Sequence, residues 1–135
     1  MSALTTLARD PRVYQAAAAG QIADAAVCIG PIPYIARCLD SVEYPAEHRW
    51  IFPVVKTVSA LGLAAAPRYP GLARLTAASL TFYFVLAVGS HLRVRDIGVN
   101  CAAATSMLAF YSTLTVAGPP DVESGSTAPR QTRPA

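Results

Sequence analysis

The sequence predicts an all-α fold, a bundle of four transmembrane helices. Its 135 residues are 53% hydrophobic and only 14% charged, whereas a soluble domain carries about 25% charged residues. A chain this short cannot bury so much apolar surface by folding in water. Four apolar stretches, divided by prolines and charges, have lengths close to the ~20 helical residues that cross a bilayer. A membrane is therefore the solvent that this composition requires.

The first predicted span covers residues 11–30. Asp10 is a favourable helix cap, and Pro11 suits the first turn, where no backbone donor is needed. Asp24 is the only charged residue deep in this span. Two prolines directly after the span cannot continue a regular helix, so the helix is expected to end there.

Residues 31–48 form the predicted first loop, which is rich in charged residues and has room for an interfacial turn at residues 34–39. Trp50, an aromatic residue typical of the membrane interface, opens the second predicted span, residues 50–66. Lys56 is the only charged residue in that span. The second span is the shortest of the four.

The last two predicted spans are residues 72–92 and 97–117. Arg74 lies near the start of the third span, and the fourth span has no formal charge. A Gly-Pro-Pro sequence then stops the last helix. The membrane domain therefore covers residues 1–118, and the tail at residues 119–135, rich in Ser, Thr, Pro and Arg, is expected to be disordered.

The distribution of arginines bears on the orientation of the chain. An even number of spans places both termini on the same side of the membrane, and four arginines then flank the membrane on each side. The count near the membrane is therefore tied. Only Arg130 and Arg133, in the tail, favour a cytoplasmic location for both termini.

The charged and sulfur-containing residues exclude other classes of protein. The net charge is +3, but the eleven cationic residues are scattered along the chain, and no basic stripe could follow a nucleic-acid backbone. The three cysteines lie on separate segments without a Cys-x-x-Cys motif, so we expect packing residues and neither a disulfide framework nor a zinc site. With two histidines in the chain, we expect no metal site.

A resemblance to a known family rests on residues 52–96. This stretch has a Pro-x-x-Lys motif at residues 53–56, a helix of small residues, the turn Pro-Gly-Leu-Ala-Arg, and Tyr-Phe-x-Leu-Ala-x-Gly-x-His-x-Arg at residues 83–93. In these features the chain resembles the DoxX-like family of small bacterial four-helix membrane proteins. The resemblance implies a multi-pass protein of the bacterial inner membrane with cytoplasmic termini. Relatives are linked with thiosulfate or quinone oxidation and with membrane complexes that handle oxidative stress.

Four residues form a predicted polar pocket beneath the first loop. An ionisable group inside a span costs about 2.5–3.5 kcal/mol unless it is paired or hydrated. Asp24 lies six residues before the end of its span and Lys56 six residues after the start of its own, so both are expected about 9 Å below the same surface. His91 ends the third span at that surface, and Arg93 lies just beyond it.

Two interpretations of this pocket stay open. In the structural one, Lys56 extends its ammonium to the interface, Asp24 pairs with it only to make insertion possible, and His91 is an ordinary interfacial residue. In the functional one, the pocket binds a proton, a quinone or a small substrate. Small residues at four-residue spacing in the first span, such as Ala16 and Gly20, favour packing within the bundle or contact with a partner.

The favoured function is a small integral membrane accessory subunit, or a module that binds a partner or an apolar ligand, with a redox link implied by the resemblance. The alternative is a quinone-interacting oxidoreductase subunit in which Lys56 and His91 polarise the carbonyl oxygens and Asp24 relays protons. A transporter is disfavoured, because no inverted repeat or broken helix is visible. No catalytic motif identifies an enzyme, and quinone is the one cofactor considered. The expected partners are the lipid bilayer and a membrane protein or a second copy of the chain.

Overall fold

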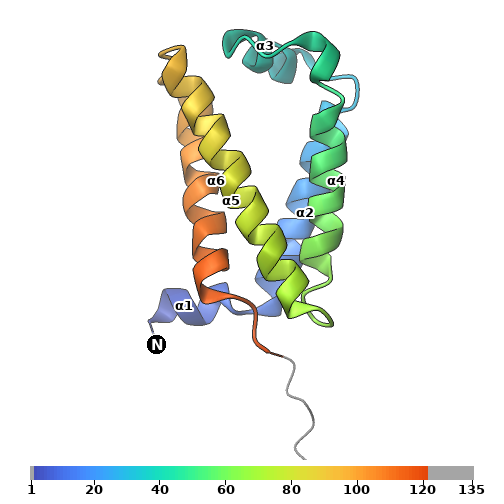
Figure 1. Cartoon of the computed structure of the whole chain (residues 1–135), viewed down its shortest axis with the longest axis vertical. Coiled ribbons are helices and arrows are strands. Elements are labelled where there is room, and N and C mark those ends of the chain that lie inside the picture. Colours follow the sequence, from blue (N-terminus) through green and yellow to red (C-terminus); the bar gives the residue numbers. More distant parts are fainter. Residues whose placement is uncertain (1, 122–135) are drawn as a thin grey trace, which may run out of the picture.

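The computed structural model describes residues 2–121, and every regular element in this part of the chain is helical. Four long helices run up and down in turn along the length of the molecule (Figure 1). They are α2 (Pro11–Cys28), α4 (Ile51–Ala64), α5 (Pro70–Arg93) and α6 (Val99–Ala117). Two short helices, α1 (Ala3–Ala8) and α3 (Pro33–Ser41), lie across opposite ends, and a 3₁₀ turn, η1 (Ala46–His48), precedes α4. The predicted all-α class is confirmed.

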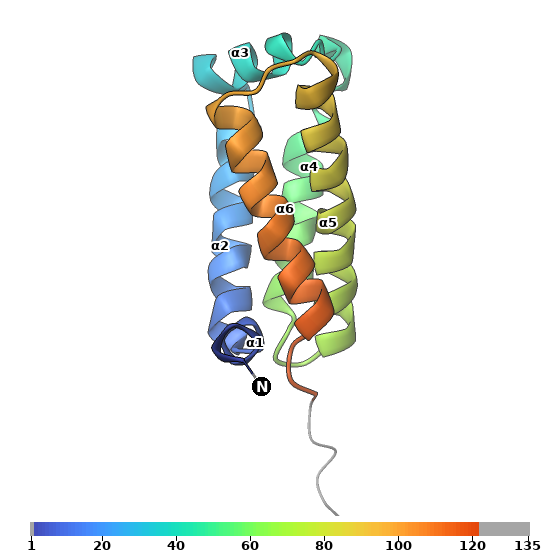
Figure 2. The same cartoon turned by 90° about the vertical axis from the view of Figure 1, so that its left-hand side faces the viewer.

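The long helices form two antiparallel pairs, α2 with α4 and α5 with α6, and contacts between α4 and α5 join the pairs. The pairs approach each other near the α1 end and diverge towards α3, which lies across the wider end (Figure 1). On the other side of the bundle, α6 runs obliquely between α2 and α5 (Figure 2). There α2 and α6 are joined by side-chain hydrogen bonds from Tyr14 and Gln21. The wide end beneath α3 is therefore where a cavity can form.

The lengths of the helices decide how many of them qualify as membrane spans. Two, α5 and α6, are long and apolar enough, and α2 with α3, bent by 88° at their junction, qualify together as a third. The 14 residues of α4 extend only about 21 Å. Val58 and Leu61 on α4 are nevertheless 62% and 67% exposed, as expected of side chains that face lipid. The chain thus has two or three spans by length and composition, and the fourth stays a prediction.

The segments outside the long helices differ from the prediction. The first loop contains a nine-residue helix, α3, where only an interfacial turn was expected, and Pro33 in its first turn suits a helix start. Helix α1 was not predicted, because six residues are too few to show a helical period. The tail predicted to be disordered is residues 119–135, and its residues 122–135 lie outside the described residues.

Small residues bring the helices together at the narrow end of the bundle. Ala73 and Ala77 on α5 are fully buried, so the backbones can approach closely. At the contact between α4 and α5, Gly62 lies so near Thr76 that a Cβ atom on Gly62 would overlap the threonine side chain. The close packing at this end therefore depends on the absence of a side chain at Gly62.

Candidate functional site

An ion pair joins α2 to α4 at the wide end of the bundle. The Lys56 ammonium donates a hydrogen bond to the Asp24 carboxylate and lies 5.4 Å from the centre of the Tyr83 ring. The Lys56 side chain is only 7% exposed, whereas that of Asp24 is 41% exposed. The ammonium is therefore enclosed between α2, α4 and α5. The structural interpretation of the sequence required the Lys56 ammonium to extend to the interface, and in the structure it does not.

A groove with a volume of about 540 Å³ opens between α2 and α6 beneath α3. We call it the lateral groove. Ala16 and Gly20 line it, so these small residues widen a cavity instead of packing against another helix. Apolar side chains such as Met107 form much of the remaining wall. The polar residues of the lining are Gln21, Asp24, Tyr34, His91, Asn100 and Tyr111.

Gln21 gives the lateral groove a polar atom without a partner. The Gln21 side chain is 4% exposed, and its amide NH₂ donates a hydrogen bond to the Tyr111 hydroxyl at 2.6 Å. Its carbonyl oxygen is buried and accepts no hydrogen bond from the described residues. Turning the amide over would leave the NH₂ group without an acceptor instead. Because a buried polar group without a partner costs about 1–3 kcal/mol, this amide favours a ligand that completes its hydrogen bonds.

His91 lies between the lateral groove and a second cavity of about 340 Å³, which is bounded by α3, α4 and α5. Its Nδ1 atom is 2.9 Å from the Asp96 carboxylate, which also accepts a hydrogen bond from the Ser41 hydroxyl at 3.3 Å. A carboxylate behind one ring nitrogen fixes the tautomer and the orientation of an imidazole. The other nitrogen, Nε2, is then left for a proton or a hydrogen bond from a bound molecule.

Arg93 fastens the segment after α3 to the end of α5. Its guanidinium donates hydrogen bonds to the backbone carbonyl of Val42 at 2.9 Å and to the Glu43 carboxylate at 3.3 Å. The Arg93 side chain is 60% exposed and does not line the lateral groove. A hydrogen bond from Tyr34 to Asn100 ties the start of α3 to α6. Arg93 therefore helps to hold α3, the helix that covers the groove, in place, and it does not itself face a ligand in the groove.

The structure brings together part of the predicted pocket. Asp24 contacts Lys56 and lines the lateral groove together with His91. Lys56 adjoins the groove only through Asp24, and Arg93 lies outside it. The residues predicted to surround one pocket thus have three different roles. Asp24 and Lys56 form an ion pair, Asp24 and His91 line the groove, and Arg93 holds the segment after α3.

Three residues at or next to the groove were missed by the sequence analysis. Gln21 and Tyr111 have no formal charge and so escaped a search for ionisable groups inside spans. Asp96 lies between the third and fourth predicted spans, residues 72–92 and 97–117, and so was not considered as an ionisable group inside a span. A search for every hydrogen-bonding side chain within an apolar stretch would have found Gln21, because a buried amide needs partners as a charge does.

Cys38, on the underside of α3, lines both cavities. Among the described residues, all three cysteines are free, and no group of three or more His, Cys, Asp or Glu side chains is placed to bind a metal ion. Burial raises the pKa of the Cys38 thiol, and the negative charge of Asp96 raises this pKa further. The thiolate therefore forms at a higher pH than in an exposed cysteine.

This pKa shift predicts the pH dependence of alkylation at Cys38. In a variant with Cys28 and Cys101 changed to alanine, the reaction rate with a small alkylating reagent should rise at a higher pH than the rate of free cysteine, because the thiolate is the nucleophile. Asp96→Asn should move the midpoint of the rate profile to lower pH. A pH–rate profile that coincides with that of free cysteine, or that is the same with and without Asp96→Asn, would contradict the structure.

The helical fold and its apolar helices define a small membrane protein. Residues 13–117, a range that contains α4, α5, α6 and most of α2, match the DoxX-like family. The chain belongs to the DoxX-like family, and the resemblance found in the sequence is confirmed. No curated protein and no solved structure is significantly similar to it.

Proposed function

We propose that this DoxX-like protein is a multi-pass membrane module that binds a small, largely apolar molecule in the lateral groove. The observation that carries the proposal is the buried Gln21 amide, which lines the groove and has one polar atom without a partner among the described residues. Binding an amphiphile would supply the missing hydrogen bond of this amide and cover the apolar wall of the groove. By family resemblance, we place the module as an accessory subunit in a membrane complex with a redox or oxidative-stress role.

The polar groups of the lateral groove indicate the chemistry of the ligand. The free oxygen of Gln21 and the half-exposed carboxylate of Asp24 both accept hydrogen bonds. A hydroxyl or amine group at one end of an apolar body would donate to Asp24, and to the enclosed Gln21 oxygen once the Gln21 side chain turns towards the groove. The remaining body would lie against Met107 and its apolar neighbours, where the groove opens between α2 and α6.

Replacing Gln21 by leucine tests this proposal. Purified wild type should bind long-chain alcohols more tightly than the matching alkanes, and Gln21→Leu should reduce that preference about tenfold, the effect of one hydrogen bond to a buried group. Gln15→Leu is the matched control. Gln15 is also on α2 but donates to the Ala64 carbonyl outside the groove, so this change should leave the preference intact. Equal binding of alcohols by wild type and Gln21→Leu would show that the Gln21 amide does not bind the ligand, and would contradict the observation on which the proposal rests.

A quinone-interacting oxidoreductase subunit is the second candidate. His91, held by Asp96 behind it and facing the groove, favours it, because Nε2 could exchange a proton with a quinone oxygen. In this version His91 and Asp24 take the proton-transfer roles, and Lys56 acts only through its ion pair with Asp24. Quinone recovered with purified wild type, and lost in His91→Leu without loss of folded protein, would favour this candidate over a redox-inactive ligand.

We further propose that all four long helices cross the cell's inner membrane, with both termini in the cytoplasm. The alternating direction of the long helices supports this arrangement, since α1 and the end of α6 lie at the same end of the bundle (Figure 1). Reporters fused after Ala66 and after Gly118 should both be cytoplasmic, and reporters after Glu43 and after Asp96 should lie on the opposite side. Reporters after Glu43 and Ala66 on the same side would show that α4 does not cross.

A further inference from the structure

The two ends of the bundle differ in how their arginines are partnered. The α3 end has four arginines and four acidic residues, and its arginines make ion pairs between Arg49 and Asp40 and between Arg93 and Glu43. Within residues 2–121, the α1 end has four arginines and two acidic residues, and none of these arginines makes an ion pair there. Those four arginines are Arg9, Arg12, Arg68 and Arg74. The α1 end therefore presents a net positive surface.

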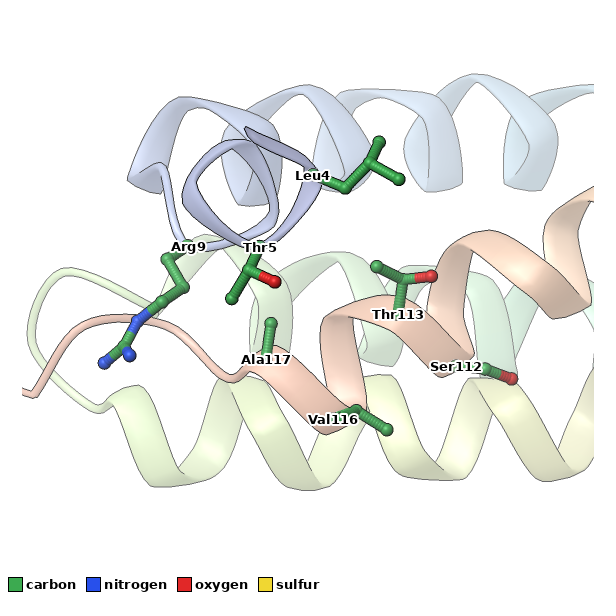
Figure 3. Close-up of a pocket in the computed structure, with 7 residues that line it drawn as sticks. All are labelled: Leu4, Thr5, Arg9, Ser112, Thr113, Val116 and Ala117. Carbon is green, nitrogen blue, oxygen red and sulfur yellow. The ribbon is translucent and has the colours of Figure 1, made fainter. Parts of the chain in front are cut away.

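At this end a cleft separates α1 from the foot of α6 (Figure 3). The α1–α6 cleft has a volume of about 520 Å³ and is lined by Leu4, Thr5, Arg9, Ser112, Thr113, Val116 and Ala117. The guanidinium of Arg9 lies at one end of the cleft, while Leu4 and Thr113 lie further along towards the middle of the bundle (Figure 3). The charge is thus at the outer end and the aliphatic wall is at the inner end.

The inner part of the α1–α6 cleft is apolar in its chemistry although two of its residues carry hydroxyls. The hydroxyls of Ser112 and Thr113 donate to backbone carbonyls one turn earlier in α6, at 2.7 and 2.8 Å. Neither hydroxyl therefore needs a further hydrogen-bond acceptor in the cleft. Leu4 and Val116 are 72% and 79% exposed. A neighbouring cavity of about 350 Å³ shares Leu4 and Thr113 and is otherwise apolar. The aliphatic wall therefore continues beyond the cleft.

We propose that the α1–α6 cleft binds an anionic glycerophospholipid, with its phosphate at Arg9 and one acyl chain along Leu4 and Val116. A guanidinium at the membrane surface is the side chain best suited to a phosphate, since it combines charge with several N–H donors. The surrounding arginines add a field that attracts anionic lipids over zwitterionic ones. The order of charge followed by apolar wall, from the end of the bundle inward, matches the order of headgroup and chain in a lipid. This site is separate from the lateral groove and does not depend on its ligand.

The test is lipid binding to the full-length protein, measured by native mass spectrometry with added phosphatidylglycerol or phosphatidylcholine. Wild type should retain phosphatidylglycerol preferentially, and Arg9→Gln should weaken its retention roughly tenfold. Arg68→Gln is the matched control, because it removes the same charge from the same end but lies outside the cleft; it should change retention less than about twofold. Equal losses in the two variants would show diffuse charge attraction and overturn the proposed site.

Two further arms separate a lipid from its headgroup. Val116→Trp should fill the cleft and weaken phosphatidylglycerol retention while every charge is kept. Soluble glycerophosphoglycerol, which has the headgroup without the chains, should not displace the lipid. Full retention by Val116→Trp, or displacement by the soluble headgroup, would overturn the proposal that an acyl chain occupies the cleft.

Discussion

Asp24→Asn alone should destabilise the protein more than Asp24→Asn combined with Lys56→Met. The single change keeps a side-chain oxygen that can accept a hydrogen bond at position 24, but it leaves a lysine ammonium that is 7% exposed without its counter-charge, and an enclosed, uncompensated ammonium is expensive. The double change removes both charges, so much of the loss should be recovered. Lys56→Met alone should have a smaller effect than Asp24→Asn, because Asp24 is 41% exposed and water in the groove can reach it.

Unfolding in mild detergent, followed for the four proteins of this double-mutant cycle, measures the coupling between the two residues. We expect a coupling energy above about 0.5 kcal/mol and the order of stability just given. Strictly additive single effects would show that the residues do not interact. A larger loss from Lys56→Met than from Asp24→Asn would show that Asp24, not Lys56, is the enclosed partner.

Gly62→Ala should destabilise the bundle through the contact between α4 and α5. The added methyl group would overlap the side chain of Thr76, whose hydroxyl is held by the Leu72 carbonyl at 2.8 Å. Overpacking at a close helix contact costs about 1–3 kcal/mol. A second change, Thr76→Ala, removes the atom nearest to the new methyl group and should restore part of the loss.

Gly89→Ala is the control for the effect of a methyl group on helix propensity. Gly89 lies inside α5 with nothing within 4 Å of the position of a Cβ atom, so this change should be neutral or stabilise by up to about 1 kcal/mol. Thermal unfolding of the variants should therefore rank Gly62→Ala below both wild type and Gly89→Ala. If Gly62→Ala unfolds at the same temperature as wild type, α4 and α5 are further apart than the structure places them.

The long helices could be located from the sequence because their signals are local. A proline or a charged residue has a large cost wherever it falls in an apolar helix, so the ends of the apolar stretches indicate the ends of the helices. The pairing of Asp24 with Lys56 also follows from simple depth, since both lie about the same distance below one surface. Neither inference required knowledge of how the helices pack.

The partners of His91 and Arg93 could not be predicted in the same way. Both lie at the end of α5, where the path of the loops decides which groups come near. His91 meets Asp96 because the chain turns back directly after α5, and Arg93 meets Val42 because α3 folds across the wide end. The lateral groove likewise results from the divergence of two helix pairs, which no single stretch of sequence encodes.

The most direct test of the lateral groove is a variant that fills it. Gly20 lines the groove and has nothing within 4 Å of its Cβ position, so Gly20→Phe should occupy the groove without disturbing the packing of α2. Small molecules retained by protein extracted gently from its native membrane can be identified by mass spectrometry. The proposed function predicts an amphiphile on wild type that is absent from Gly20→Phe, while ligand-free Gly20→Phe is at least as thermally stable as ligand-free wild type. The same molecule at the same level on both proteins would contradict a ligand site in the lateral groove.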